Sequence, residues 1–171
     1  MSEGFWVFAA ARLRELTLDG LILSGGDRSL ADDLVQEALT RTALAWSGVR
    51  NQSHPEAYVR RAMARICWKT GSRARRELSV DMSLAAVTGA GASVDDHSIA
   101  LVSRLGLLAA LALLPPRQRA VVVLRYLEDM SEAETAAALH CSVGTVKSQA
   151  HRALKALRVL MPDLNEEDID A

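Results

Sequence analysis

Residues 130–158 read MSEAETAAALHCSVGTVKSQAHRALKALR, which is the pattern of a helix-turn-helix. Ser131 is placed to cap a first helix, with Glu134 three residues later as its capping-box partner. The turn falls at residues 140–142, and Ser142 is the natural cap of a second helix that starts at about Val143. Apolar residues then recur at helical spacing along this second helix and predict its buried side: Val146, Ala150, Ala153, Leu154 and Leu157.

The remaining side chains of the second helix suit DNA. They are short polar groups and cations, and no acidic residue occurs between Val143 and Leu160. A recognition helix in the major groove uses short polar groups for base edges and cations for phosphates. The alternative is an amphipathic helical hairpin with a solvated basic face. The capped first helix, the tight turn and the acid-free second helix together favour DNA binding.

Composition predicts an all-α protein. The chain has 171 residues, of which 50% are hydrophobic and 4% aromatic, and the alternation typical of strands is nearly absent. The net charge of −1 hides an asymmetry, because the tail at 162–171 carries five acidic residues and no cation. The rest of the chain is therefore net basic, which is compatible with a nucleic-acid partner.

Targeting and redox features are few. Cys67 and Cys141 are far apart and lie in no metal-ligand spacing, which predicts two reduced thiols, no metal and no cofactor. The first residues are the reverse of a secretory signal, and no apolar run reaches the length that spans a bilayer. We therefore expect a cytoplasmic protein without membrane insertion.

A linker divides the chain into two small helical domains. Residues 78–98 lack periodicity, are rich in Ala, Gly, Ser and Val, and contain acidic residues but no Lys or Arg. This composition predicts a flexible, mildly acidic linker between an N-terminal domain at 4–77 and a C-terminal domain at 99–161, which contains the helix-turn-helix. An acidic tail follows at 162–171.

The N-terminal domain reads as three helices. The first covers about 5–24, with a break near Asp19 and Gly20, and the second starts near Ser29, which is spaced to cap it. Its first turns carry an exposed acidic patch. After a loop at 48–55, a third helix runs from Pro55 to about Arg76.

The third helix is strongly basic. It carries seven cations between Val59 and Arg76 and no acid, and such a series repels itself unless a polyanion is present. Trp68 lies among these cations, where an aromatic ring can stack on an unpaired base, although for this single residue a tryptophan of the core is favoured. For the arginines, nucleic-acid contact is favoured over a solvated face.

These motifs resemble a bacterial RNA polymerase sigma factor of the extracytoplasmic-function (ECF) type, in the form common in actinobacteria. The stretches that carry the resemblance are DRSLADDLVQEAL, PEAYVRRA, LPPRQRAVVVLRYLEDMSEAETAAAL and CSVGTVKSQAHRALKALR, in the expected order. The resemblance covers most of residues 15–160 apart from the linker. It implies a promoter-specificity subunit that is not an enzyme and acts only with the core polymerase.

The resemblance also implies partners and site residues. The polymerase-binding residues would be Asp33, Gln36 and Glu37, docking on the clamp helices of the largest polymerase subunit. The promoter's −10 element would be opened and held by Arg60, Arg61, Arg65, Trp68, Lys69 and Arg73. The C-terminal domain would bind the flap of the second-largest subunit and read the −35 element with Thr145, Lys147, Ser148, Gln149 and Arg152, supported by Arg117, Arg119 and Arg125 on phosphates.

Four positions depart from the family pattern. Arg65 stands where asparagine is common, and Gly71 lies near a frequent aromatic. His140 occupies a turn position where glycine is usual, so the turn needs a left-handed residue other than Gly. Gln149 replaces a frequent arginine, which exchanges a phosphate or guanine contact for an adenine contact. The promoter sequence therefore does not follow from the resemblance.

Two other functions compete with this interpretation. One is a stand-alone helix-turn-helix regulator, against which the acidic patch and the arginine helix argue. The other is an enzyme, but the candidate acid–base and metal-binding side chains occur singly. Family members are often held by an anti-sigma factor, and no residue here specifies whether one holds this chain. For the acidic tail, a disordered solubilising end is favoured over a segment that masks the recognition helix.

Overall fold

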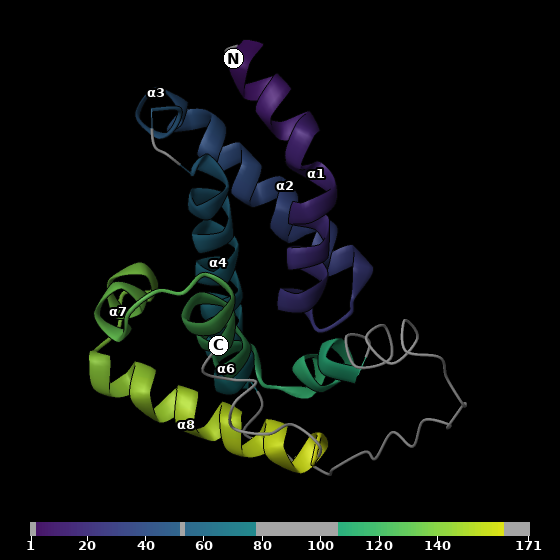
Figure 1. Ribbon diagram of the computed structural model, residues 1–171, viewed down its shortest axis with the longest axis vertical. Helices are drawn as coiled ribbons and strands as arrows, with labels where there is room; N and C mark the ends of the chain where they lie inside the picture. The colour runs from purple at the N-terminus through teal and green to yellow at the C-terminus, as the bar shows by residue number, and fades with distance from the viewer. Residues whose placement is uncertain (1–2, 52–53, 78–105, 163–171) are drawn as a thin grey trace.

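The computed structural model of the chain describes residues 3–51, 54–77 and 106–162 (Figure 1). Within these residues every regular element is helical, so the prediction of an all-α fold is confirmed. The predicted linker and all but the first residue of the predicted acidic tail lie outside the described residues. We call the described residues up to 77 the N-terminal module and those from 106 the C-terminal module.

The N-terminal module contains α1 (Glu3–Ser24), α2 (Arg28–Leu44), α3 (Trp46–Val49) and α4 (Pro55–Glu77). The turn before α2 passes through Gly25 and Gly26, whose φ angles of 78° and 84° suit glycine. The predicted cap of α2 was wrong: the N-cap is Asp27, not Ser29, because the Asp27 carboxylate accepts a hydrogen bond from the Leu30 N–H at 3.0 Å.

The predicted break in the first helix does not occur, since α1 is continuous through Gly20. Gly20 is instead a point of close approach between α1 and α2. A Cβ atom there would lie 2.9 Å from Val35 Cγ2 and 3.2 Å from the Ala31 carbonyl oxygen, both on α2. The glycine therefore serves helix packing, which chain-local propensity does not register.

The C-terminal module begins with a helical segment at 106–113, followed by α6 (Pro116–Val122), the π-helical turn η1 (Val123–Leu127), α7 (Glu132–Leu139) and α8 (Val143–Leu160). Pro116 occupies the first turn of α6, where its missing N–H has no helical partner to lose. The chain then passes through η1, and Asp129 adopts a left-handed φ of 47° before α7 begins.

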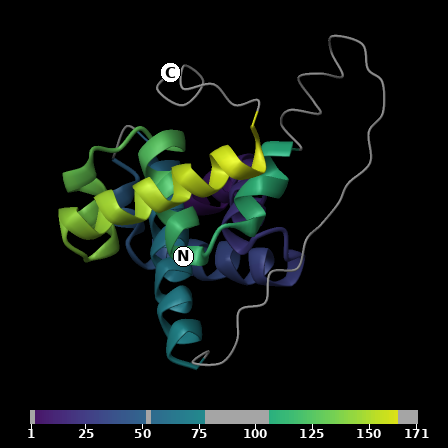
Figure 2. The same ribbon diagram turned by 90° about the horizontal axis from the view of Figure 1, so that it is seen from below.

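The two modules share one apolar core. A single cluster of buried side chains includes Val59 and Met63 of α4, Val121 of α6, Leu124 of η1 and Val146 of α8. Figures 1 and 2 show α4 running from the N-terminal helices into the C-terminal module, where α6 lies against it. We call this boundary between the modules the seam.

Candidate nucleic-acid interface

The helix-turn-helix has the predicted capping box. The Ser131 hydroxyl accepts a hydrogen bond from the Glu134 N–H at 3.2 Å, and the Glu134 carboxylate accepts one from the Ser131 N–H at 2.8 Å. The Ser131 hydroxyl also donates to the Glu134 carboxylate at 2.6 Å. The bonds that this hydroxyl and the Ser131 N–H donate favour the ionised carboxylate and lower the pKa of Glu134. The start of α7 is thus specified by its own sequence.

The turn between α7 and α8 takes a left-handed residue without glycine. His140 has φ 53° and ψ 52°, as the sequence predicted for this position. Its N–H donates to the carbonyls of Ala136 and Ala137, and the N–H of Cys141 donates to the Ala136 carbonyl at 3.0 Å. These bonds satisfy the carbonyls at the end of α7 and set the direction in which α8 departs.

Helix α8 presents a polar and basic face outward. Ser142 caps it as predicted, because its hydroxyl accepts a hydrogen bond from the Thr145 N–H at 3.1 Å. Lys147, Ser148 and Arg152 are exposed, and Thr145 is half-buried at the start of the helix. The Lys147 ammonium lies 3.5 Å from the carboxylate of Glu132 on α7. These side chains are placed as a major-groove reading surface requires.

Gln149 does not lie on this exposed face. It is only 8% exposed and faces inward with Val146 and Ala153. The sequence contains the signal for this placement, since Gln149 follows Val146 by three residues and precedes Ala153 by four. In this arrangement its amide does not reach a base.

Arg119, predicted to support DNA binding from α6, is buried at the seam with 5% exposure. Its guanidinium donates to the carbonyls of Leu23, at 2.9 Å, and Ile22, at 3.4 Å, near the end of α1. It also donates to the carbonyls of Leu114, at 2.7 Å, and Ala112, at 3.2 Å, at the end of the 106–113 segment. The last carbonyls of a helix lack intrahelical partners, and a cation there also opposes the negative end of the helix dipole. Burial lowers the pKa of Arg119. In this arrangement the side chain holds the modules together instead of reaching phosphates.

Arg117 and Arg125, the other two predicted supporting arginines, are half-buried. Arg117 places its guanidinium 4.8 Å from the centre of the Trp68 ring, a cation–π contact across the seam. Arg125 donates to the Met130 carbonyl just before α7. Both side chains contact protein groups in this structure.

The arginine helix, α4, also uses its predicted DNA-binding side chains in protein contacts. Arg60 forms ion pairs with Asp19 of α1 at 2.7 Å and with Glu128, which follows η1, at 3.2 Å. Arg65 donates through Nε to the Ala138 carbonyl of α7 at 2.7 Å. Trp68 is buried with 6% exposure, so it belongs to the core in this arrangement.

The other predicted residues of α4 differ in exposure. Arg61 is half-buried and donates to the Ala57 carbonyl of its own helix at 3.0 Å. Lys69 is exposed. The side chain of Arg73 lies outside the described residues.

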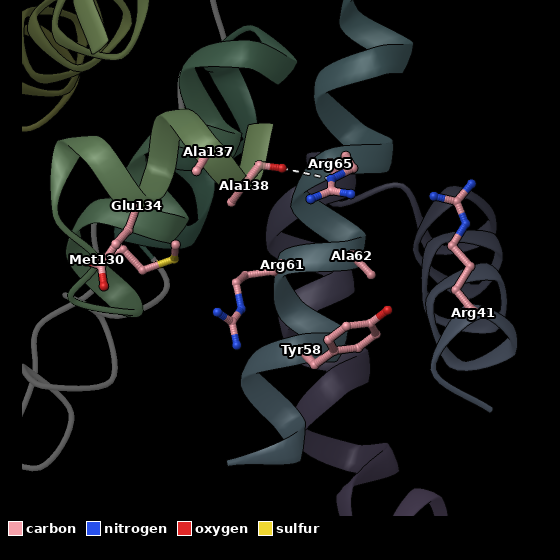
Figure 3. A pocket seen from close by; sticks show the side chains of 9 residues that line it. All are labelled: Arg41, Tyr58, Arg61, Ala62, Arg65, Met130, Glu134, Ala137 and Ala138. Carbon is pink, nitrogen blue, oxygen red and sulfur yellow. Dashed lines mark hydrogen bonds between the residues drawn. The ribbon is translucent and has the colours of Figure 1, made fainter. Parts of the chain in front are cut away.

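A cleft of about 440 Å³ lies between α4 and α7 (Figure 3). Its lining joins three arginines and a tyrosine of the N-terminal module to residues of the C-terminal module: Arg41, Tyr58, Arg61, Ala62, Arg65, Met130, Glu134, Ala137 and Ala138. Figure 3 shows the hydrogen bond from Arg65 of α4 to the Ala138 carbonyl of α7, two of the residues that line the cleft. Helix α7 therefore covers part of the basic face of α4.

The acidic patch of α2 is exposed. Asp33, Gln36 and Glu37 all lie on the solvent side of the helix, and Glu37 pairs with Arg41 at 2.8 Å one turn along. An exposed i,i+4 pair of this kind contributes only roughly 0.3–0.5 kcal/mol to the stability of a helix. Stabilisation of α2 therefore does not account for the acidic patch. The patch is free to meet a partner.

Glu128 is a seam residue that the sequence did not reveal. Its side chain is 11% exposed, and burial raises the pKa of Glu128 while the nearby Arg60 guanidinium opposes that shift. Its partner Arg60 lies in the other module, so no local spacing connects the two residues. Asp19 and Arg60 pair within the N-terminal module, but they are 41 positions apart, so local spacing does not reveal this pairing either.

None of the helices described has the length and hydropathy that a bilayer crossing requires. Among the described residues, no group of three or more His, Cys, Asp or Glu side chains is arranged to hold a metal ion.

Known proteins resemble this chain in sequence and in fold. The family profile described as Sigma-70, region 4 matches residues 104–157. RNA polymerase sigma-E factor of Streptomyces avermitilis is 44% identical over 143 residues, which span 82% of this chain and 74% of that protein. ECF RNA polymerase sigma factor SigL of Mycobacterium tuberculosis is 33% identical over 148 residues, 81% of this chain and 78% of that protein.

A solved structure supports the fold. The sigma factor RpoE from Bartonella quintana, crystallised with the anti-sigma factor NepR, superposes with a TM-score of 0.61 at 22% identity, covering 96% of this chain and 100% of that chain. At that identity the likeness concerns the fold alone. The sequence relatives carry the family assignment, and family members are transcription initiation factors. The chain belongs to the ECF RNA polymerase sigma factors.

Proposed function

We propose that this chain binds the core of a bacterial RNA polymerase in the cytoplasm and directs it to a class of promoters, with all catalysis supplied by the polymerase. The observation that carries the proposal is the exposed face of α8, where Lys147, Ser148 and Arg152 project from a capped helix-turn-helix. In this role that face reads the −35 element.

The polymerase contact falls to the acidic patch of α2. Asp33, Gln36 and Glu37 are exposed on one helix, and Glu37 pairs with Arg41 of the same helix. A cluster of carboxylates on a helix face fits a basic partner surface, and such complementarity speeds encounter more than it adds affinity. We assign this patch to the clamp helices of the largest subunit and the C-terminal module to the flap of the second-largest subunit.

We assign contact with the −10 element of the promoter to side chains of α4: Arg60, Arg61, Arg65, Trp68, Lys69 and Arg73. Cations along a helix track a phosphate backbone, and an aromatic among them can stack on a base that has left the duplex. Arg60, Arg65 and Trp68 contact the C-terminal module in the arrangement described above.

Run-off transcription tests the proposed function. Purified bacterial core polymerase is supplied with a library of promoters, with and without this protein, and the initiated sequences are read. Selective initiation from one class of promoter is the expected result, and the selected sequences define both elements.

Two variants localise the contacts. Glu37→Lys reverses the charge of the acidic patch and is expected to abolish initiation, whereas Glu15→Lys reverses an exposed charge on α1 and is expected to leave it intact. Arg152→Ala is expected to weaken initiation, with Arg14→Ala on α1 as the matched surface control. No initiation, together with tight sequence-specific DNA binding by the protein alone, would identify a stand-alone helix-turn-helix regulator instead.

A further inference from the structure

The cleft between α4 and α7 is strongly cationic (Figure 3). Its lining carries three guanidinium groups and one carboxylate, that of Glu134, and three positive charges with one negative give a formal net charge of +2. The arginines are Arg41 of α2 and Arg61 and Arg65 of α4. Cations gathered around one cavity repel one another, and a bound anion offsets that repulsion. The proposed function uses Arg61 and Arg65 and leaves Arg41 without a role.

Each of the three arginines is held by a hydrogen bond from its Nε atom. The acceptors are Glu37 Oε1 for Arg41, at 2.8 Å, the Ala57 carbonyl for Arg61, at 3.0 Å, and the Ala138 carbonyl for Arg65, at 2.7 Å. Within the described residues, the Nη nitrogens of these arginines make no hydrogen bond. A bond at Nε orients the guanidinium plane and leaves the N–H donors of both Nη nitrogens, which suit the oxygens of a phosphate.

The carboxylate of Glu134 supplies an acceptor beside these donors. Its Oε2 atom accepts from the Ser131 N–H at 2.8 Å and from the Ser131 hydroxyl at 2.6 Å. Its Oε1 atom makes no hydrogen bond within the described residues, so it can accept one from a ligand. A nucleoside has donors for this oxygen in its ribose hydroxyls and in the amino group of its base.

Tyr58 gives the cleft an aromatic wall. The side chain is half-buried, and it packs against the apolar cluster that contains Trp46. Within the part of the chain that the structure describes, its hydroxyl makes no hydrogen bond. The rest of the lining is small or apolar: Ala62, Met130, Ala137 and Ala138. An aromatic ring beside small side chains offers a flat surface on which a nucleobase can stack.

The volume of the cleft suits a small organic anion. Its value of about 440 Å³ lies within the range of about 300–1,000 Å³ that is typical of ligand pockets. An inorganic phosphate ion would use the guanidinium groups and leave the aromatic wall unused. A nucleoside would use that wall and leave the cations uncompensated. A nucleotide uses both.

We propose that the cleft binds a free nucleotide that has two or more phosphates. The Nη nitrogens of Arg41, Arg61 and Arg65 hold the phosphates, Tyr58 stacks on the base, and Glu134 accepts a hydrogen bond from the nucleoside. Binding at this site requires neither DNA nor polymerase. One consequence rests on the proposed function: Arg61 and Arg65 are assigned to the −10 element, so a bound nucleotide competes with the −10 strand for them.

Isothermal titration calorimetry of the full-length protein at low salt tests the site. ADP and GDP are the nucleotide probes, pyrophosphate has the phosphates without the nucleoside, and adenosine has the nucleoside without phosphates. We expect both nucleotides to bind and adenosine to give no measurable heat. Pyrophosphate should bind about tenfold more weakly than ADP, because it lacks the stacked base.

Arg41→Gln is the main variant, because Arg41 lines the cleft and has no assigned contact with DNA or polymerase. Losing a charged donor is expected to weaken ADP binding about tenfold or more. Arg14→Gln removes an equal charge from the exposed surface of α1 and is the matched control, with no change expected. Tyr58→Leu should lower the affinity for ADP to that for pyrophosphate and leave the latter unchanged, with circular dichroism checking that each variant folds.

Run-off transcription tests the competition with the −10 strand. The protein is incubated with ADP before core polymerase and promoter are added, and each yield is compared with that of the same protein without ADP. We expect ADP to lower the yield of the parent and not that of Arg41→Gln. An unaffected parent would overturn the competition.

The outcomes separate the nucleotide site from the proposed function. Equal ADP binding by the parent, Arg14→Gln and Arg41→Gln would show a general attraction of anions to a basic surface and would overturn the site. Failure of both nucleotides to bind would overturn it too, and binding of a single-stranded oligonucleotide in their place would assign the cleft to nucleic acid. ADP binding that weakens in Arg41→Gln, with no run-off transcription, would support the site and overturn the proposed function.

Discussion

Leu124→Ala tests whether the two modules unfold as one unit. Leu124 lies in η1 of the C-terminal module, is fully buried and belongs to the core cluster that includes Met63 of α4. Truncating a buried leucine to alanine removes apolar burial and leaves a cavity. We expect it to lower the free energy of unfolding by about 3 kcal/mol, within the usual range of about 2–5 kcal/mol. With a urea dependence of about 2 kcal/mol per molar, the midpoint should fall by about 1.5 M if the seam transmits the whole effect.

The reporters lie in the other module. All three tryptophans, Trp6, Trp46 and Trp68, precede residue 77, so tryptophan fluorescence follows the N-terminal module and, through Trp68, the seam. We expect urea unfolding by fluorescence and by far-ultraviolet circular dichroism to coincide and to shift together in Leu124→Ala. Leu157→Ala is the matched control, because Leu157 belongs to a second cluster with Leu111 and Leu114, to which the N-terminal module contributes the partly buried Ile22. It should shift the fluorescence transition less.

One result would refute this reasoning. If the fluorescence midpoint of Leu124→Ala equals that of the parent while circular dichroism shows an earlier transition, the modules unfold separately. The shared core would then contribute too little free energy to couple them.

Three further predictions concern single residues. Ser142→Ala removes the cap of α8 and should lower the free energy of unfolding, measured by urea denaturation, by about 1 kcal/mol. Ser148→Ala on the same helix is the control and should change the free energy of unfolding by less than about 0.5 kcal/mol. Burial raises the pKa of the Cys67 thiol from its ordinary value of 9.0 to about 11, so its contribution to stability is present below pH 9 and is lost as pH rises toward 11. Cys67→Ala should flatten that part of the stability profile, and an unchanged difference between the two proteins from pH 8 to 11 would contradict this prediction. Arg152→Gln should weaken binding of a −35 duplex and reduce the slope of log affinity against log salt by about 1, and an unaltered slope would show that Arg152 meets no phosphate.

The local elements followed from local chemistry. The capping box at Ser131 and Glu134, the cap at Ser142 and the left-handed turn at His140 all involve residues within a few positions of one another, so short-range rules specify them. The cap of α2 was misplaced by two residues because Asp27 and Ser29 both suit a cap, and only the backbone geometry distinguishes them.

The family also followed from the sequence, since the order of motifs along the chain is itself sequence information. Exposure of the acidic patch on α2 and of the reading face of α8 was predictable from helical periodicity. The same periodicity also predicts the inward placement of Gln149, whereas its polar side chain predicts exposure. Periodicity and polarity conflict at this position, and polarity gave the wrong prediction.

Only the tertiary structure decided what the arginines do in this arrangement. Arg60, Arg65 and Arg119 read from sequence as groups that meet phosphates, yet their partners are Glu128, a carbonyl of α7 and carbonyls of α1, all in the opposite module. A cation has no sequence-encoded preference between a phosphate and a protein oxygen, because both satisfy the same donors. Short-range interactions determine the helix positions, the caps and the acidic and basic faces, so the sequence alone predicts them. The seam arises from packing between residues tens of positions apart, which no local pattern specifies.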